Sequence, residues 1–158
     1  MDLLIIRHGK AEDHSADGSD AARQLTEKGW RQAEAVGNCL RRLDWLPELY
    51  LSSPRARALQ TARGVMSATG ADGEPVLQSW LDFGMSDEEA FAELGAYQAC
   101  GRIALFGHEP SFSSFVQWLL GADAWIEVKK ASLIGLSIES RSRRLVNLHF
   151  VIPPKAIL

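Results

Sequence analysis

Residues 3–9 read Leu3-Leu4-Ile5-Ile6-Arg7-His8-Gly9, four apolar residues followed by an arginine, a histidine and a glycine. A short apolar run bounded by a turn residue is typical of a buried strand. Open α/β sheets bind their ligands beyond the carboxyl ends of strands, and Gly9 lets the backbone turn sharply and approach a ligand there. The stretch therefore predicts a strand with Arg7 and His8 at its carboxyl end, where Arg7 binds an anion and His8 acts as a nucleophile or base.

A second stretch has the same form. The apolar run at residues 103–106 ends in Gly107-His108-Glu109-Pro110. If both runs are strands of one parallel sheet, their carboxyl ends meet at the same edge. The two stretches together predict that His8 and His108 lie close to each other.

Composition limits the kinds of partner. The chain has 158 residues, 46% hydrophobic and 23% charged, and a formal net charge of -3, which fits one globular domain over residues 1–158. A chain without a basic excess is a poor match for nucleic acid or an anionic membrane. Two cysteines without CxxC spacing argue against structural zinc and a disulfide framework. We expect a cytoplasmic protein, because the first apolar run is too short for a signal peptide.

Strand-like and helix-like segments alternate along the chain. Thr26 is a candidate N-cap for a helix to about residue 43, and Ser53 with Pro54 is a candidate helix start. A three-layer α/β/α sandwich with a mainly parallel mixed sheet is therefore expected. The remaining predicted elements are strands at 48–51, 76–77 and 102–106, helices at 90–99 and from Pro110, and a terminal hairpin of 133–139 with 145–152.

Positively charged residues gather at the predicted strand ends. Arg7 follows the first strand, Arg55 the second, and Arg23 precedes the first long helix. Arginines that converge beside His8 and His108 repel one another unless an anion lies between them. Guanidinium forks match phosphoryl oxygens, and Arg55 also lies at a helix start, where free N–H groups favour an anion. The pattern predicts a phosphoryl site.

At this point the sequence resembles a known family. Its motifs are similar to those of the histidine phosphatase superfamily, which has the phosphoglycerate mutase-like fold, and more closely to the SixA-type phosphohistidine phosphatases. The resemblance covers residues 3 to about 120 and rests on Arg7-His8-Gly9, Arg23-Gln24-Leu25-Thr26, Ser52-Ser53-Pro54-Arg55-Ala56-Arg57-Ala58, Gln60-Thr61-Ala62 and Gly107-His108.

The resemblance implies a role for each matched residue. His8 is expected to attack phosphorus and form a phosphohistidine intermediate. Arg7, Arg55 and His108, together with Arg23, are expected to hold the phosphoryl oxygens. No metal or cofactor is implied. Nearby arginines disfavour an imidazolium, so His8 is expected to be neutral, whereas the sequence leaves the charge of His108 open.

Other charged residues have a structural interpretation. Arg57 and Arg63 are expected on the solvated face of the helix that follows Arg55. The polar loop at 10–24 is expected to be mobile, and its role as a lid is left open. His14 is expected to have no role in the polar loop, His149 to be exposed and Glu109 to cap a helix. Lys130 is expected to be solvated, and a place at the edge of the site is left open for it.

The sequence shows no clear equivalent of the family's usual general acid. Many members of the superfamily carry a carboxylic acid in mid-chain, and Asp82 is the nearest candidate here, with Asp87 and Glu88 behind it. An alkoxide leaving group needs such an acid. A phosphohistidine protonated on its ring instead releases neutral imidazole, whose conjugate acid has a pKa near 6.5, so it depends less on an enzyme acid.

The sequence thus favours a metal-independent phosphatase of phosphohistidine in proteins, with histidine-containing phosphotransfer domains of signal transduction as partners and inorganic phosphate as product. The short chain leaves little room for a cap domain, which fits a protein substrate. Two alternatives stay open. One is a phosphatase of small phosphomonoesters or of phosphoserine and phosphothreonine proteins. The other is a phosphate-binding module without turnover.

Overall fold

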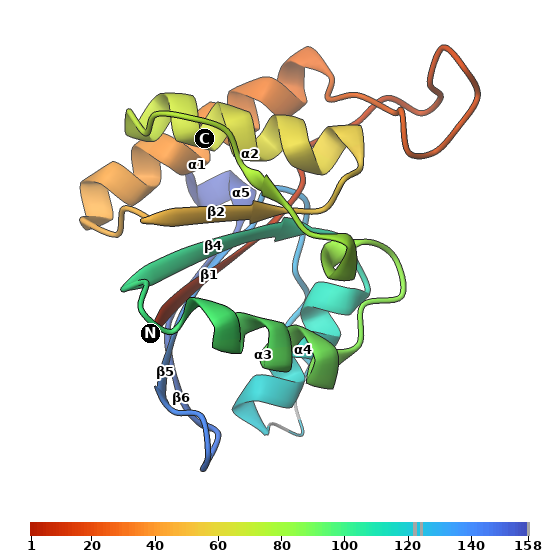
Figure 1. Ribbon diagram of the computed structural model, residues 1–158. Coiled ribbons are helices and arrows are strands. Elements are labelled where there is room, and N and C mark those ends of the chain that lie inside the picture. The colour runs from red at the N-terminus through yellow and green to blue at the C-terminus, as the bar shows by residue number, and fades with distance from the viewer. Residues whose placement is uncertain (122, 124, 158) are drawn as a thin grey trace.

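The computed structural model of the protein describes residues 1–121, 123 and 125–157, and in this part of the chain it contains a six-stranded sheet (Figure 1). The strand order is β3-β2-β4-β1-β5-β6. Neighbouring strands among β3, β2, β4 and β1 are parallel. The strand β5 is antiparallel to both of its neighbours, β1 and β6. The strands are β1 (Asp2–Arg7), β2 (Leu49–Ser52), β3 (Val76–Leu77), β4 (Arg102–Gly107), β5 (Leu133–Ser140) and β6 (Leu145–Ile152).

Helices cover both faces of this sheet, as Figure 1 shows. One face carries α1 (Glu27–Leu43), α2 (Ala56–Thr69) and the short α5 (Pro154–Ile157). The other carries α3 (Asp87–Glu93) and α4 (Ser111–Leu120). Two 3-10 turns, at Ser79–Leu81 and Leu94–Tyr97, complete the second face. The predicted three-layer sandwich with a mainly parallel mixed sheet is therefore confirmed.

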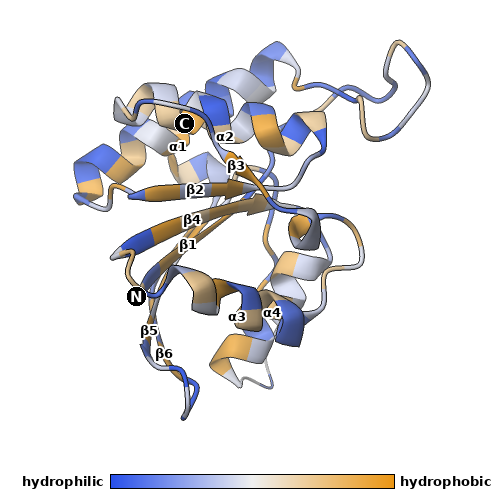
Figure 2. Cartoon of the chain, in the orientation of Figure 1, coloured by the Kyte–Doolittle hydropathy of each residue, from blue (hydrophilic) through white to orange (hydrophobic). Residues whose placement is uncertain are grey.

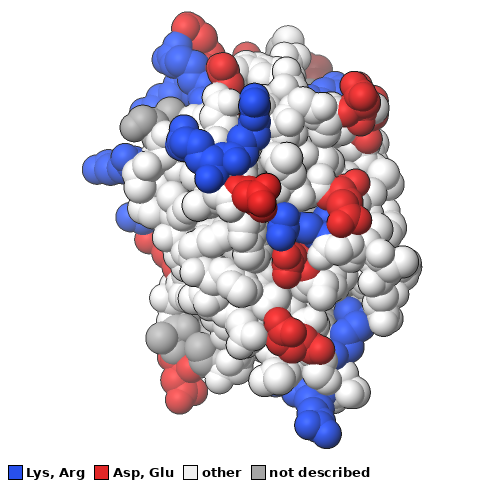
Figure 3. All heavy atoms as spheres, turned by 90° about the vertical axis from the view of Figure 1, so that its left-hand side faces the viewer, with Lys and Arg blue, Asp and Glu red and all other residues white. Residues whose placement is uncertain are grey.

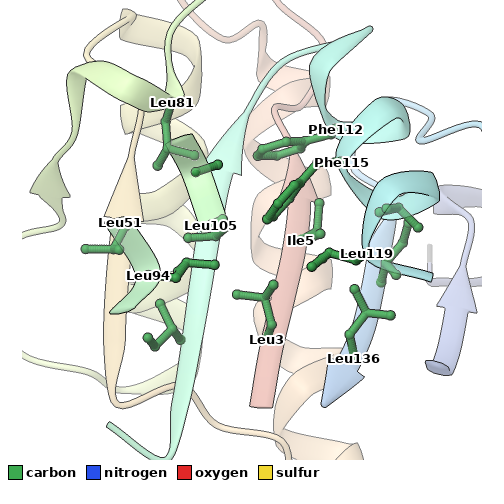
Figure 4. Close-up of a cluster of buried hydrophobic side chains, with 14 of the residues drawn as sticks. Leu3, Ile5, Leu51, Leu81, Leu94, Leu105, Phe112, Phe115, Leu119 and Leu136 are labelled. Carbon is green, nitrogen blue, oxygen red and sulfur yellow. The ribbon is translucent and has the colours of Figure 1, made fainter. Parts of the chain in front are cut away.

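Alternation along β1 explains why both faces need helices. Leu3 and Ile5 pack into the core beneath α3 and α4 (Figure 4), while Leu4 and Ile6 pack toward α1 and α2. All four side chains are fully buried. Successive side chains of a strand point to opposite faces, so a continuous apolar run fits a strand covered on both sides. Figure 2 shows the apolar strands between amphipathic helices.

Some helix boundaries differ from the prediction. Thr26 caps α1 as expected, with its hydroxyl accepting from Gly29 N at 3.2 Å. Ser53 does not start α2, which begins at Ala56 with Arg55 as its N-cap, although the Ser53 hydroxyl accepts from Arg55 N at 3.3 Å and also hydrogen-bonds His108.

The single helix predicted at 90–99 is also wrong, because it divides into α3 and a 3-10 turn. Ser86 caps α3 four residues before Ala90, by accepting from Glu89 N at 3.3 Å. Acidic residues follow in the first turn, where they complement the helix dipole. The helix thus begins at Asp87, three residues before the predicted start.

Parallel pairing brings the functional junctions together. Arg7 pairs with Gly107, and Ser52 pairs with Phe106. His8, Ser53 and His108 therefore leave the same sheet edge, at the right in Figure 1. Figure 3 shows the opposite end of the molecule, where acidic and basic side chains are both spread over the surface.

Among the residues that the structure describes, no helix has the length and apolar character needed to cross a membrane.

Candidate active site

A cavity of about 240 Å³ lies at the edge where β1 and β4 end. It contains four of the predicted site residues, Arg7, His8, Arg23 and His108, but neither Arg55 nor Asp82. Its full lining is Arg7, His8, Asp20, Arg23, Arg57, Phe83, His108, Glu109 and Lys130. The sequence pattern thus located the cavity but assigned part of its lining to the wrong residues.

His8 is held in one tautomer. Its side chain is 6% exposed, and its Nδ1 lies 2.7 Å from the carbonyl oxygen of Gly9. A carbonyl only accepts, so Nδ1 carries the proton. The Nε2 atom accepts from Arg57 Nε at 3.2 Å, and a guanidinium only donates. The available lone pair of the His8 ring is therefore on Nε2.

Burial also keeps His8 neutral. It lowers the pKa of His8 to about 3, and the positive charges of Arg57 and Arg7 act in the same direction, against the opposing hydrogen bond to Gly9. At neutral pH the imidazole is therefore unprotonated at Nε2, which is the state that a nucleophile needs.

The backbone beside His8 is fixed by the helices next to it. Gly9 N donates to Thr61 Oγ1 at 3.0 Å, and Lys10 N donates to Gln32 Oε1 at 2.8 Å. Gly9 itself is required by close packing, because an added Cβ would lie 2.8 Å from Gly29 O at the start of α1. Its φ is not in the left-handed region, so the glycine serves the contact between β1 and α1.

His108 completes a pair of neutral imidazoles. Its ring centroid is 5.3 Å from that of His8, its side chain is 2% exposed, and its Nε2 lies 2.8 Å from Ser53 Oγ. Burial lowers the pKa of His108 to about 4, with Arg57 and Arg55 contributing and Asp82 opposing. The His108 ring, whose charge the sequence left open, is thus neutral at neutral pH.

Two buried nitrogens at the cavity have no hydrogen-bond partner among the described residues. They are Nδ1 of His108 and Nε of Arg7. The Arg7 guanidinium is otherwise held by Nη1, which donates to Val128 O at 3.1 Å. A buried polar atom without a partner is costly, and an anion that accepted hydrogen bonds in the cavity would remove that cost.

Arg57 occupies the position that the sequence analysis gave to Arg55. The prediction that Arg57 is solvated is wrong, because its side chain is 3% exposed and contacts His8. The sequence contains a signal for this placement. Arg57, Thr61 and Val65 follow at i, i+4 and i+8, which is one stripe of a helix, and Thr61 and Val65 are fully buried.

Arg55 instead lies at the rim. Its Nε donates to Asp82 Oδ1 at 2.5 Å and its Nη1 donates to Asp20 Oδ2 at 2.7 Å. The guanidinium carbon stacks 3.7 Å from the centroid of the Phe83 ring. Two carboxylates and an aromatic face thus occupy this side chain, so Arg57, and not Arg55, contacts His8.

Asp82 is poorly suited to act as a general acid. Burial alone would raise its pKa, but hydrogen bonds from Arg55 and from Phe83 N at 2.7 Å lower it below the ordinary value. The carboxyl group is therefore ionised at neutral pH and has no proton to give. It also lies outside the cavity lining. The structure does not support the assignment of the acid to Asp82.

Asp20 was missed by the sequence analysis, which treated residues 10–24 as a mobile loop. The loop is closed at its base, where Glu12 N donates to Gln24 O at 2.8 Å. It is also tied to α2, because Ala56 N donates to Ala21 O at 3.0 Å. Loops have no periodicity that predicts burial or contact, so only the folded chain shows that Asp20 reaches the cavity.

Arg23 lies beside Asp20 as part of the same loop. Its Nε donates to Glu12 O at 2.6 Å, and its Nη1 donates to Asp20 Oδ1 at 2.9 Å. Although burial alone would raise the pKa of Asp20, hydrogen bonds from Arg23 and Arg57 lower it to about 2. Asp20 is therefore an anion among arginines.

The remaining predictions for charged residues agree with the structure. Glu109 accepts from Ser113 N at 2.9 Å near the start of α4, and it also lines the cavity. Lys130 is exposed, as expected, and it also lines the cavity, which the sequence had left open. Arg63 is exposed and pairs with Glu74, while His14 and His149 are exposed.

Two further observations concern where ligands can bind. A larger hollow of about 560 Å³ lies between α1 and α2 and includes Trp30 and Arg63, but neither His8 nor His108 lines it. Within residues 1–121, 123 and 125–157, no three His, Cys, Asp or Glu side chains are grouped so that they could hold a metal ion. Positive charge at the cavity comes from Arg7, Arg23, Arg57 and Lys130.

The chain is similar to known proteins in sequence. Residues 3–79 match the family described as the histidine phosphatase superfamily (branch 1). An uncharacterized protein from Picosynechococcus sp. is 31% identical over 140 residues, which cover 86% of this chain and 84% of that protein. Mannitol-1-phosphatase from Eimeria tenella is 32% identical over 106 residues, which cover 60% of this chain and 34% of that enzyme.

The fold is also similar to solved structures. The protein histidine phosphatase SixA complexed with tungstate superposes with a TM-score of 0.89, covering 98% of each chain at 21% identity. At this level of identity the match concerns the fold, and the assignment of chemistry depends on the side chains of the cavity.

Proposed function

The chain belongs to the histidine phosphatase superfamily, and we propose that it is a phosphatase that transfers a phosphoryl group first to His8 and then to water. The observation that carries this proposal is the state of His8. The ring is neutral, its proton is on Nδ1, and its Nε2 lone pair is beside the Arg57 guanidinium. This arrangement prepares a nucleophile next to a group that stabilises the charge of a phosphoryl group.

The reaction proceeds in two displacements. In the first, Nε2 of His8 forms a bond to phosphorus while the bond from phosphorus to the leaving group breaks. Arg57 Nε moves its hydrogen bond from Nε2 to a phosphoryl oxygen. In the second, water attacks the phosphorus of phosphorylated His8, the P–N bond breaks, and phosphate leaves as the lone pair returns to Nε2.

The other residues of the cavity bind the phosphoryl oxygens. Arg7 offers an unpartnered Nε, and His108 offers an unpartnered Nδ1. Arg23 and Lys130 supply further positive charge at the opening. In a phosphoryl-transfer transition state the charge is spread over the equatorial oxygens, so donors that surround the phosphorus are expected to lower the barrier.

We propose phosphohistidine in proteins, as in phosphotransfer domains, as the substrate class. The support comes from the carboxylates: Asp82 is ionised by Arg55, and Asp20 is held by arginines. With these two carboxylates bound by arginines and the Glu109 carboxylate accepting from Ser113, leaving groups that depart as neutral imidazole are favoured over alkoxides. The similarity in fold to the protein histidine phosphatase SixA agrees with this choice.

A second candidate is a phosphatase of small phosphomonoesters. The observation that favours it is the 32% identity to mannitol-1-phosphatase over 106 residues. An alkyl phosphate releases an alkoxide, which requires a proton donor, so this candidate requires that one of the carboxylates at the cavity becomes an acid when substrate binds.

The test is phosphate release from a phosphohistidine-bearing phosphotransfer domain, from mannitol 1-phosphate and from p-nitrophenyl phosphate. Wild type, His8→Ala and Asp82→Ala are compared on each substrate. We expect the highest kcat/KM on phosphohistidine, loss of turnover in His8→Ala, and little change in Asp82→Ala. A preference for the sugar phosphate that depends on Asp82 would establish the second candidate, and phosphate binding without turnover would end the phosphatase assignment.

A further inference from the structure

The carboxylate of Asp20 binds three arginines at once. Its Oδ1 accepts from Arg23 at 2.9 Å, and its Oδ2 accepts from Arg55 at 2.7 Å and from Arg57 at 2.9 Å. The backbone oxygen of Asp20 accepts from Arg57 Nη1, also at 2.9 Å. Asp20 therefore orients Arg57 through two separate acceptors.

The two hydrogen bonds along one edge of Arg57 show what Asp20 replaces. Nε and Nη2 form one edge of a guanidinium and together bind two oxygens of an anion. Here Nε donates to His8 Nε2 and Nη2 donates to Asp20 Oδ2. A phosphoryl group attacked by Nε2 of His8 would accept from the same edge. The Asp20 carboxylate thus lies where a phosphoryl oxygen has to bind.

Charge explains why such a substitute is useful. Arg23, Arg55 and Arg57 approach one point, and their mutual repulsion would spread them apart in an empty site. Asp20 neutralises part of this charge and keeps the guanidiniums gathered. When phosphate binds, the carboxylate has to give way, because two anions a few ångströms apart repel, while the backbone oxygen can keep its hold on Arg57.

We propose that Asp20 is a positioning residue that acts through Arg57, as an internal anion that holds the phosphoryl clamp in place and that substrate and product must displace. The proposal rests on the proposed function and adds a competition to it. Asp20 weakens the binding of phosphate in the ground state, which limits product inhibition, and it preserves the alignment of Arg57 with His8.

The test compares Asp20→Asn with wild type. The amide keeps the size of the side chain but removes its charge. We expect inorganic phosphate, measured by titration calorimetry, to bind at least about fivefold more tightly. KM and the inhibition constant of phosphate should fall by a similar factor, while kcat does not rise. A residue that merely supports the fold would instead raise KM or leave all three constants unchanged.

The matched control is Asp13→Asn. Asp13 is exposed on the same loop and does not line the cavity, so this variant changes the net charge equally. We expect its phosphate affinity to stay within about twofold of wild type, since exposed charges are screened by solvent and salt. An equal gain in affinity in both variants would reduce the effect to net charge and overturn the proposal.

Two further measurements keep the outcome clear. Asp20→Ser removes the carboxylate by a different substitution and should shift phosphate affinity in the same direction, whereas Asp20→Glu should restore much of the wild-type value. Unchanged or weaker phosphate binding in both Asp20→Asn and Asp20→Ser would refute the proposal. The binding measurement needs no turnover, so its result is independent of whether phosphohistidine is the substrate.

Discussion

Separate replacement of Arg55, the N-cap of α2, and of Arg57, in its first turn, by alanine distinguishes the structural account from the sequence pattern. The spacing alone favoured Arg55 as the phosphate clamp, whereas the structure places Arg57 against His8 and Arg55 at the rim. We predict that Arg57→Ala reduces activity far more than Arg55→Ala. Both substitutions remove one positive charge from the same helix start, so each serves as the control for the other.

The magnitudes follow from the contacts. Arg57 is 3% exposed and its Nε is 3.2 Å from the attacking nitrogen. Loss of one such preorganised donor costs about 100- to 1000-fold in kcat, or about 2.7–4 kcal/mol of transition-state stabilisation. Arg55 makes its ion pairs with Asp20 and Asp82 at the solvent-facing rim. These pairs are partly solvated, and solvent screening limits such pairs to about 1 kcal/mol or less; because Arg55 also does not line the cavity, Arg55→Ala should cost about fivefold or less.

The assay is steady-state phosphate release, with kcat and KM determined separately for each variant and the melting temperature measured as a check on folding. Arg57→Lys keeps the charge without the planar fork, and we expect it to recover only a small part of the loss. Equal losses in Arg55→Ala and Arg57→Ala, or a larger loss in Arg55→Ala, would refute the assignment of the clamp to Arg57.

Three other predictions concern pH, the general acid and metal ions. The pKa of His8 is about 3 and that of His108 about 4 in the folded protein, whereas both are near 6.5 in the unfolded chain. As the pH falls below about 6.5, only the unfolded chain binds these protons. The free energy of unfolding is therefore highest above about pH 6.5 and decreases as the pH falls. Urea denaturation should show a loss of about 2 kcal/mol per histidine between pH 7 and pH 5, and His8→Gln should remove half of it; an unchanged slope in that variant would contradict the buried neutral state. Asp82→Asn should change kcat/KM on phosphohistidine by less than about threefold, because the carboxyl is ionised by Arg55; a loss above tenfold would restore it as a catalytic group. Activity should persist in EDTA, because guanidiniums supply the positive charge, and inhibition reversed by added metal would point to another mechanism.

The apolar runs were sufficient to predict the frame of the protein. Leu3 to Ile6 alternate between two buried faces, and a strand with two apolar faces requires helices on both sides. The sheet edge at which His8 and His108 meet follows from parallel pairing, since both histidines come directly after strands. The terminal hairpin also agrees with its pattern, with β5 and β6 close to the predicted bounds.

The finer assignments required the folded chain for separate physical reasons. Ser53 was interpreted as a cap, and its hydroxyl does accept from Arg55 N, but it also hydrogen-bonds the ring of His108, which follows β4, and a sequence pattern does not show this second partner. The start of α2 at Ala56 then changes the position of each arginine: Arg55 stays outside the helix and Arg57 enters its buried stripe. Asp20 comes from a loop, where no periodicity links sequence to contact.

The central claim is that His8 Nε2 becomes phosphorylated during turnover. The most direct measurement is rapid quenching of enzyme mixed with a radiolabelled phosphohistidine-bearing phosphotransfer domain, followed by mass spectrometry under alkaline conditions that preserve a phosphoramidate. We predict a phosphoryl group on His8 that forms and decays within one turnover and is absent from His8→Asn. Label on another residue, or turnover that persists in His8→Asn, would contradict the account.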